Sequence, residues 1–214
     1  MIFRFEKMIP LPLLEQDTEG SEVWEAPSLL IEQGKSYVVE AASGRGKTSL
    51  LSVMYGIRHD YQGEVYLDDD NISSFGWKKW SALRKNKLSV IFQGLELFDD
   101  LTSLENILLK NNITAYRSRD RIVELARALG MEPFLNRKAG ILSFGQQQRV
   151  AIIRALVQPF DFLLADECFS HMDKENTFKA YELIQKECSE RNAGLVLTSL
   201  NETDLPGINT RLML

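Results

Sequence analysis

Two glycines, a lysine and a threonine make the segment Tyr37–Leu50 the part of this chain best suited to chemistry. Tyr37–Ala41 is rich in β-forming residues, and Gly-Lys-Thr at 46–48 opens a helix. Gly44 and Gly46 let the backbone approach a polyphosphate, whose oxygens are attracted by the N–H groups at a helix N-terminus. We therefore predict a phosphate-binding loop. An ordinary strand-to-helix turn with two glycines is the alternative.

The chemistry of the loop residues gives each a predicted role. Lys47 is placed to reach the β and γ phosphates of a nucleotide, and the Thr48 hydroxyl suits a magnesium ion. The usual pattern has glycine at the position of Ala41, where alanine fits only if the backbone φ is not positive. The predicted nucleotide-binding residues of the loop are Ser43, Gly44, Arg45, Gly46, Lys47, Thr48 and Ser49.

A second feature is the carboxylate pair Asp166-Glu167, which follows the apolar run Phe162–Ala165. Continuous apolar character predicts a buried strand, and α/β folds place their ligands at the carboxyl ends of such strands. Asp166 suits a magnesium ion, and Glu167 suits the polarisation of an attacking water. A simple polar end to the strand is the alternative, but the phosphate loop in the same chain favours a metal and general-base pair.

The sequence Leu-Ser-Phe-Gly-Gln at 142–146 lies between these two features. Ser143 can cap a helix, whose N-terminus can also bind phosphate. The segment resembles the Leu-Ser-Gly-Gly-Gln signature of the ABC transporter ATPases, with Phe144 in place of the first glycine. The resemblance implies that Ser143, Gly145 and Gln146 contact the γ-phosphate of ATP held by a second subunit. Helix capping and phosphate binding can hold together.

The resemblance covers nearly the whole chain, and the motifs stand in the order that the family has. It assigns Gln93, at the end of the expected strand Lys87–Phe92, to a glutamine that touches magnesium beside the groove facing a membrane partner. Asp173 matches the aspartate that bridges the two subunits. The predicted magnesium-binding residues are Thr48, Gln93 and Asp166.

Position 199 departs from the family, which usually has a histidine after the strand that we expect over Leu195–Thr198. Ser199 is shorter and cannot become cationic near neutral pH, so ATP binding should survive while turnover is slow. We hypothesise that His171 partly compensates across a dimer. Trp24 is a poor fit by spacing to the aromatic residue that stacks on adenine. The predicted catalytic residues are Glu167, Lys47, Gln93 and Ser199.

Further elements follow from composition and periodicity. Apolar residues at three and four spacing over Leu104–Leu129 predict helices that Gly130 closes, and another helix follows Ser143 and ends near Pro159. A polar, aromatic segment after Asn71 receives no element. The other expected strands are Ile2–Phe5, Leu29–Ile31 and Gly63–Leu67, with a turn at 33–35.

This alternation predicts an α/β fold with a mostly parallel sheet and helices on both faces. The resemblance specifies a P-loop NTPase core with an N-terminal antiparallel β subdomain and an inserted α-helical subdomain at about 95–158. It also implies one ABC ATPase domain over residues 1–214.

Composition sets the class of protein. Of 214 residues, 44% are hydrophobic and 26% charged, which is typical of a soluble globular chain, and the net charge of −5 predicts no nucleic-acid partner. The two cysteines predict free thiols in a reducing cytosol. Arg4, Glu6 and Lys7 interrupt the apolar N-terminus, which argues against a signal peptide. No apolar run reaches the ~20 residues that cross a bilayer.

We therefore expect an ATP-binding subunit that binds and hydrolyses Mg-ATP at a homodimer or heterodimer interface. It would work in the cytoplasm on the inner face of the membrane, driving a permease. In its compact length the chain resembles the short ATPases of lipoprotein-releasing and macrolide-exporting systems. The alternative is an ATP-binding switch, or the degenerate half of a heterodimer, with little hydrolysis.

Overall fold

A computed structural model describes residues 1–200 and 205–214 of the chain. Its strands are β1 (Ile2–Pro10), β2 (Ser28–Glu32), β3 (Ser36–Glu40), β4 (Tyr61–Leu67), β5 (Asp70–Asn71), β6 (Leu88–Ile91), β7 (Phe162–Asp166), β8 (Gly194–Ser199) and β9 (Thr210–Met213). Its α-helices are α1 (Lys47–Met54), α2 (Trp77–Asn86), α3 (Ser103–Thr114), α4 (Arg119–Ala128), α5 (Phe144–Leu156) and α6 (Lys174–Glu190). Short 3₁₀ helices span Leu11–Leu13, Ile72–Ser74, Glu132–Phe134 and Ala139–Ile141.

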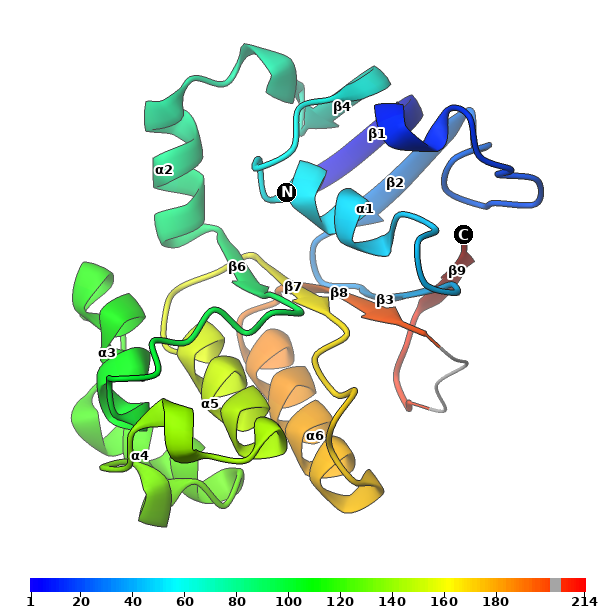
Figure 1. The fold of residues 1–214 in the computed structure, drawn as a ribbon. Coiled ribbons are helices and arrows are strands. Elements are labelled where there is room, and N and C mark those ends of the chain that lie inside the picture. The colour runs from blue at the N-terminus through cyan, green and yellow to red at the C-terminus, as the bar shows by residue number, and fades with distance from the viewer. Residues whose placement is uncertain (201–204) are drawn as a thin grey trace.

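A parallel sheet with strand order β6-β7-β8-β3-β9 forms the centre of the fold (Figure 1). Successive side chains of a strand point to opposite faces. On β7, Leu163 and Ala165 therefore join one hydrophobic core, whereas Phe162 and Leu164 join another. Burial on both faces explains why this strand has an uninterrupted apolar sequence.

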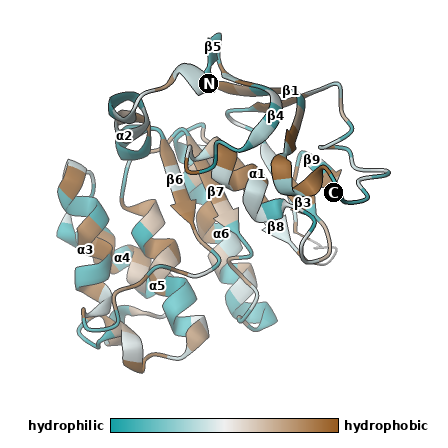
Figure 2. Cartoon of the chain, turned by 45° about the horizontal axis from the view of Figure 1, so that its top comes forward, coloured by the Kyte–Doolittle hydropathy of each residue, from teal (hydrophilic) through white to brown (hydrophobic). Residues whose placement is uncertain are grey.

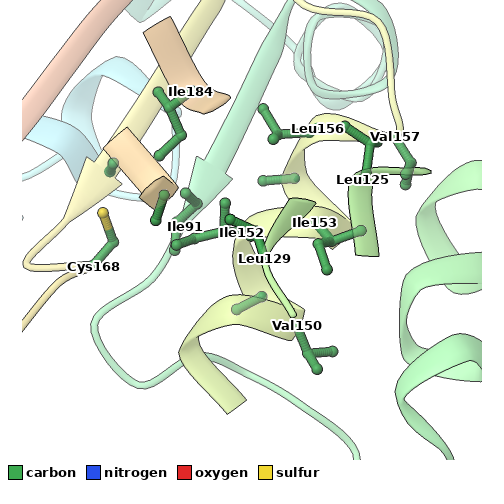
Figure 3. Close-up of a cluster of buried hydrophobic side chains, with 14 of the residues drawn as sticks. Ile91, Leu125, Leu129, Val150, Ile152, Ile153, Leu156, Val157, Cys168 and Ile184 are labelled. Carbon is green, nitrogen blue, oxygen red and sulfur yellow. The ribbon is translucent and has the colours of Figure 1, made fainter. Parts of the chain in front are cut away.

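The first core lies between the parallel sheet and the helices α3, α4, α5 and α6 (Figure 1). Figure 3 shows Ile91 of β6 beside Ile152 of α5, in a cluster that also includes Leu125 of α4 and Ile184 of α6. Helix α6 buries one stripe at three and four spacing, whereas α5 also buries the consecutive residues 150–153 and so is covered on most sides. The core thus joins the helical segment between β6 and β7 to the sheet.

The second core lies on the other face of the parallel sheet, under an antiparallel sheet with strand order β2-β1-β4-β5. Leu50 of α1 is buried there together with Phe3 of β1, Ile31 of β2 and Val65 of β4. The rings of Phe3 and Phe162 meet edge to face, with centroids 5.5 Å apart. Figure 2 shows hydrophobic residues along β6 and α1, with more hydrophilic stretches on α3 and α4.

A buried carboxylate connects α6 to the helical segment. The side chain of Glu187 is 0% exposed and forms ion pairs with Arg117 and Arg121, at 2.6 Å each, and with Arg191. Burial raises the pKa of Glu187, but the charges of Arg191 and Arg117 and the hydrogen bonds from Arg121 and Arg191 outweigh it and lower that pKa.

The predicted fold class is confirmed: a parallel sheet with helices on both faces accompanies an antiparallel sheet near the N-terminus. The helices α3, α4 and α5 fall within the predicted insertion at 95–158, whose status as a subdomain stays a prediction. No helix among residues 1–200 and 205–214 is both long enough and apolar enough to span a membrane.

Some elements differ from the sequence prediction. Strand β1 continues to Pro10, well past Phe5, because a register shift between Glu6 and Ile9 keeps it paired with β4. Strand β3 ends at Glu40, one residue before the predicted end at Ala41. Helix α2 occupies part of the segment that received no element; Trp80 is its one buried residue, so an apolar period is missing.

Candidate functional site

The loop between β3 and α1 has the backbone geometry of a phosphate cradle. Strand β3 ends at Glu40 and α1 begins at Lys47. Gly44 and Gly46 have φ values of 83° and 98°, a region that glycine enters without steric cost. Ala41 does not have a positive φ, so its methyl group is compatible with the loop. The N-terminal N–H groups of α1 can therefore receive an anion at this position.

Trp24 packs against this loop at Arg45 and Gly46. Its indole Nε1–H donates a hydrogen bond of 3.0 Å to the carbonyl oxygen of Arg45, and the residue is only 6% exposed. A Cβ atom added at Gly46 would lie 2.9 Å from the Trp24 ring and 2.5 Å from Leu13. The Arg45 side chain donates to the carbonyl oxygen of Asp17. Trp24 is thus a packing residue of the loop, a role that the sequence did not reveal.

The other predicted loop residues differ in their surroundings. Ser43 is exposed at the tip of the loop. The Ser49 hydroxyl accepts a hydrogen bond from the guanidinium group of Arg58, which also pairs with Asp60 at 3.0 Å. Arg58 therefore adds a positive charge next to the first turn of α1.

The Lys47 ammonium group is buried at the centre of the site. It donates hydrogen bonds to the carbonyl oxygens of Ala41 (2.7 Å) and Ala42 (3.0 Å), and it lies 3.3 Å from Glu167 Oε1. Gln93 Nε2 donates to the other carboxylate oxygen of Glu167 at 3.0 Å. The Lys47 and Glu167 side chains are 4% and 9% exposed. Three residues from distant parts of the sequence thus meet beside the loop.

The second carboxylate, Asp166, forms a separate hydrogen-bonded pair with Thr48. The Thr48 hydroxyl lies 2.6 Å from Asp166 Oδ2, and the Thr198 hydroxyl donates to Oδ1 at 2.6 Å. Thr198 also accepts a hydrogen bond of 3.0 Å from the backbone N–H of Glu167. Sequence reasoning missed Thr198, although a polar residue at the end of an apolar strand was a usable signal.

Glu167 has an unusual backbone. Its φ of 45° lies in the left-handed region, which is uncommon for a residue other than glycine and often occurs at functional sites. Ser199 accepts a backbone hydrogen bond of 3.2 Å from Ala41, so β8 adjoins the phosphate loop. Glu167, Thr198 and Ser199 line one cavity of about 340 Å³. Position 199 therefore faces the same space as the predicted base.

The residues around the phosphate loop form a first group of predicted ligands, and Ser143, Gly145, Gln146 and Asp173 form a second group. Ser143 caps α5 by accepting from the Gln146 N–H at 3.3 Å, while the Gln146 side chain accepts from the Ser143 N–H at 3.0 Å. Gly145 lies in the first turn of α5, and Asp173 caps α6 through Asn176. Within the described part of the chain, no hydrogen bond or ion pair joins Ser143 or Asp173 to the phosphate loop.

The group around the phosphate loop offers oxygen ligands that suit magnesium. Thr48, Asp166 and Gln93 provide a hydroxyl, a carboxylate and an amide oxygen, the hard ligands that Mg²⁺ prefers. Residues 1–200 and 205–214 contain no cluster of three His, Cys, Asp or Glu side chains that could hold a metal alone. Such a site fits an ion that arrives with nucleotide phosphates, as Mg²⁺ commonly does.

Together the fold and this site define an α/β phosphate-binding protein with a carboxylate pair beside its loop. Residues 25–170 match the family model described as ABC transporter. The chain belongs to this family and is an ABC-type ATPase.

Curated relatives come from both import and release systems. The glucose import ATP-binding protein GlcV of Saccharolobus solfataricus is 34% identical over 85% of this chain, which spans about half, 52%, of that protein. The lipoprotein-releasing system ATP-binding protein LolD 1 of Chlorobium luteolum is 31% identical over 91% of this chain and 82% of its own length.

Among solved structures, the dimeric bacterial ABC transporter cassette MJ0796 matches with a TM-score of 0.77 and 26% identity, over 94% of this chain and 88% of that one. A dimeric post-hydrolysis state of MJ0796, bound to ADP and Pi, matches with a TM-score of 0.71 and 30% identity, over 81% of this chain and 78% of that one.

Proposed function

We propose that this chain binds and hydrolyses Mg-ATP at the interface of two ABC subunits and thereby drives a membrane permease. The observation that carries the proposal is the convergence of Lys47, Gln93 and Glu167 beside the phosphate loop. Such a cluster combines a phosphate-binding cation, a polar orienting group and a carboxylate base, as phosphoryl transfer to water requires.

Nucleotide binding would begin with an exchange of partners at Lys47. An ammonium group has three donors, and the contacts to Ala41, Ala42 and Glu167 account for them. A phosphate oxygen must therefore replace at least one of these partners. Replacement of Glu167 would pair Lys47 with a more highly charged anion and would release the carboxylate.

The released Glu167 carboxylate is then available to accept a proton from the attacking water. Gln93 can hold one carboxylate oxygen in place while the other orients that water. Ser199 offers a hydroxyl on the same cavity, where the family usually has an imidazole. Since one hydroxyl stabilises less developing charge than an imidazolium, we expect slow turnover.

Thr48, Asp166 and Gln93 are the residues that would hold Mg²⁺ with the phosphates. When bound, the ion would neutralise charge on the β and γ phosphoryl oxygens. Asp166 is already oriented for this by the Thr198 hydroxyl, which fixes one carboxylate oxygen and leaves the other toward Thr48. Thr198 is thus a positioning residue for the predicted metal ligand.

Dimerisation follows from the separation of the two groups of ligands. Ser143, Gly145, Gln146 and Asp173 lie on the N-terminal ends of α5 and α6, apart from the phosphate loop. In a dimer these ends would cover the nucleotide of the partner subunit, as the signature motif implies. The dimeric state of the similar cassette MJ0796 supports this arrangement. Both a homodimer and a heterodimer fit it.

A cationic groove between α2 and α3 is the surface that we assign to the permease. Its volume is about 420 Å³, and its walls are Trp77, Ser81, Arg84, Lys85, Lys110 and Ile113. Burial lowers the pKa of Lys110, and the charges of Arg154 and Arg84 lower it further. An acidic side chain on a permease segment would relieve this repulsion.

Arg154, whose charge acts on Lys110 of this groove, connects the groove to the nucleotide site. The Arg154 guanidinium group donates to the carbonyl oxygens of Leu95 and Glu96, just after Gln93. A permease segment that pairs with Arg84, Lys110 and Arg154 could therefore shift Gln93. Through Gln93 it could also shift Glu167. Localisation on the inner face of the membrane would follow from this contact.

One observation favours a second function, an ATP-dependent switch with little hydrolysis. Ser199 stands where the family usually has histidine, so a subunit could close on ATP and reopen slowly. Such a chain could also be the less active half of a heterodimer. It would still bind ATP and dimerise.

The experiment that tests the proposal is sedimentation of the Glu167→Gln chain with and without Mg-ATP. We expect a monomer without nucleotide and a dimer with it, because ATP remains bound when hydrolysis is blocked. Lys47→Ala in the same background should stay monomeric with Mg-ATP. A Glu167→Gln chain that binds ATP yet remains monomeric at high concentration would exclude the homodimer and point to a heterodimer with a different partner subunit.

A further inference from the structure

An aromatic pair joins the start of α5 to the loop that follows β7. The rings of Phe144 and His171 have centroids 4.3 Å apart and meet at 63°, a favourable edge-on geometry. His171 Nδ1 also lies 2.8 Å from the Ser170 hydroxyl. Phe144 remains 44% exposed, which is high for a large apolar side chain.

Two further contacts fix the same loop on α5. The buried Gln148 amide donates to the Ser170 hydroxyl at 3.2 Å and accepts from the His171 N–H at 3.1 Å. Gly145 permits a close approach, because a Cβ atom there would lie 2.8 Å from the carbonyl oxygen of His171. The loop therefore contacts α5 at Phe144, Gly145 and Gln148, which lie in the first two turns of the helix.

The loop has functional residues at both ends. It starts at Glu167, the predicted base, whose carbonyl oxygen accepts from the Ser170 N–H at 3.2 Å, and it ends at Asp173, which caps α6. The aromatic pair thus connects the predicted base to the predicted dimer contacts within one chain.

We propose that Phe144 is a positioning residue that holds the 167–173 loop on the N-terminus of α5 by its contact with His171, so that Ser143 and Asp173 meet a second subunit as one pre-ordered surface. The inference rests on the proposed function. A glycine at position 144 could not make this contact. Because an ordered loop loses less conformational entropy on association, the pair strengthens ATP-dependent dimerisation without touching the nucleotide of its own subunit.

This arrangement gives His171 a role inside its own chain, as the partner of Phe144 and Ser170. Its suggested compensation for Ser199 across a dimer stays a separate prediction. The two roles differ in their readout, because loop positioning changes the dimerisation constant whereas compensation changes turnover.

A double-mutant cycle tests the inference in the Glu167→Gln background. Dimerisation with Mg-ATP is measured by sedimentation for the parent, Phe144→Gly, His171→Ala and the double variant, and Phe144→Tyr is the conservative control. We expect each single variant to weaken dimerisation about three- to tenfold, the double variant to be no weaker than either single one, and Phe144→Tyr to match the parent. Binding of a fluorescent ATP analogue to the monomer should be unchanged in all of them.

Phe144→Gly and Phe144→Tyr variants that dimerise equally well, with equal thermal midpoints, would overturn the inference and leave the proposed function intact. Multiplicative losses in the double variant would also overturn it, because Phe144 would then act on the partner independently of His171. A parent that binds ATP but never dimerises would instead exclude the homodimer, and this inference with it.

Discussion

Replacement of Glu187 by glutamine should destabilise the chain far more than replacement of any exposed carboxylate. The Glu187 side chain is fully buried, and it is the shared partner of Arg117, Arg121 and Arg191. Glutamine keeps the shape of the side chain but removes its charge. Arg117 and Arg191 would then lose their carboxylate partner, and of the three guanidinium groups only that of Arg121 would keep one, Glu124 at 2.9 Å.

The expected loss is about 3 kcal/mol. Removal of one partner from a buried ion pair costs about 3–5 kcal/mol. The lower end applies because Arg117 and Arg121 retain 19% and 28% exposure, so water can partly solvate them after the substitution. For a chain of this size about 2–4 °C is lost per kcal/mol, which predicts a fall of about 6–12 °C in the melting temperature.

Thermal unfolding followed by circular dichroism measures this loss, with Glu190→Gln as the matched control. Glu190 lies on the same helix and pairs weakly with Lys186 at 3.9 Å, so its replacement should cost less than about 0.5 kcal/mol. Equal melting temperatures for the two variants would refute the reasoning. They would mean that the charge of Glu187 contributes no more to stability than an exposed carboxylate does.

The pH dependence provides a second check. Because folding lowers the pKa of Glu187, the stabilisation is fully present above the unfolded value of about 4.3 and is lost as the pH falls through the folded pKa. The difference in stability between wild type and Glu187→Gln should therefore be constant from neutral pH down to about 5 and shrink below about 4. A constant difference down to pH 3 contradicts this account.

Three other predictions concern the site and its surroundings. Ser199→His should raise the steady-state turnover at least about tenfold, because an imidazole stabilises more transition-state charge than a hydroxyl; an unchanged kcat contradicts the role given to position 199. Trp24→Phe removes the hydrogen bond to Arg45 and should raise the Kd for ATP about two- to tenfold, with little change in kcat, as measured by equilibrium binding and kinetics. Burial raises the pKa of the Cys188 thiol to about 12 and also raises that of Cys168, so a thiol reagent at pH 8 should label neither before unfolding and both after it.

The phosphate loop and the carboxylate pair were predictable because their signals are local. Gly44, Gly46 and Lys47 lie within four positions, and Asp166 follows directly on an apolar strand. The sequence also predicted that alanine fits at position 41 only if its backbone φ is not positive. Ala41 does not have a positive φ in the structure.

Contacts between distant segments could not be predicted in the same way. The hydrogen bond between Thr198 and Asp166 depends on the register of β7 with β8, in which these two residues are direct partners. The packing of Trp24 on the loop joins positions 21 residues apart. The left-handed backbone of Glu167 has no sequence signal, because glutamate is not a residue that favours this conformation.

Steady-state ATP hydrolysis by the purified chain tests most directly the claim that Glu167 is the base of an ABC-type ATPase. The comparison is between wild type, Glu167→Gln and the exposed control Glu175→Gln, which lies in the first turn of α6. We predict turnover by wild type and Glu175→Gln, and at least a ~100-fold loss for Glu167→Gln, which should still bind ATP. Hydrolysis by Glu167→Gln at the wild-type rate would contradict the assignment of the base, and ATP binding without turnover by wild type would favour the switch instead.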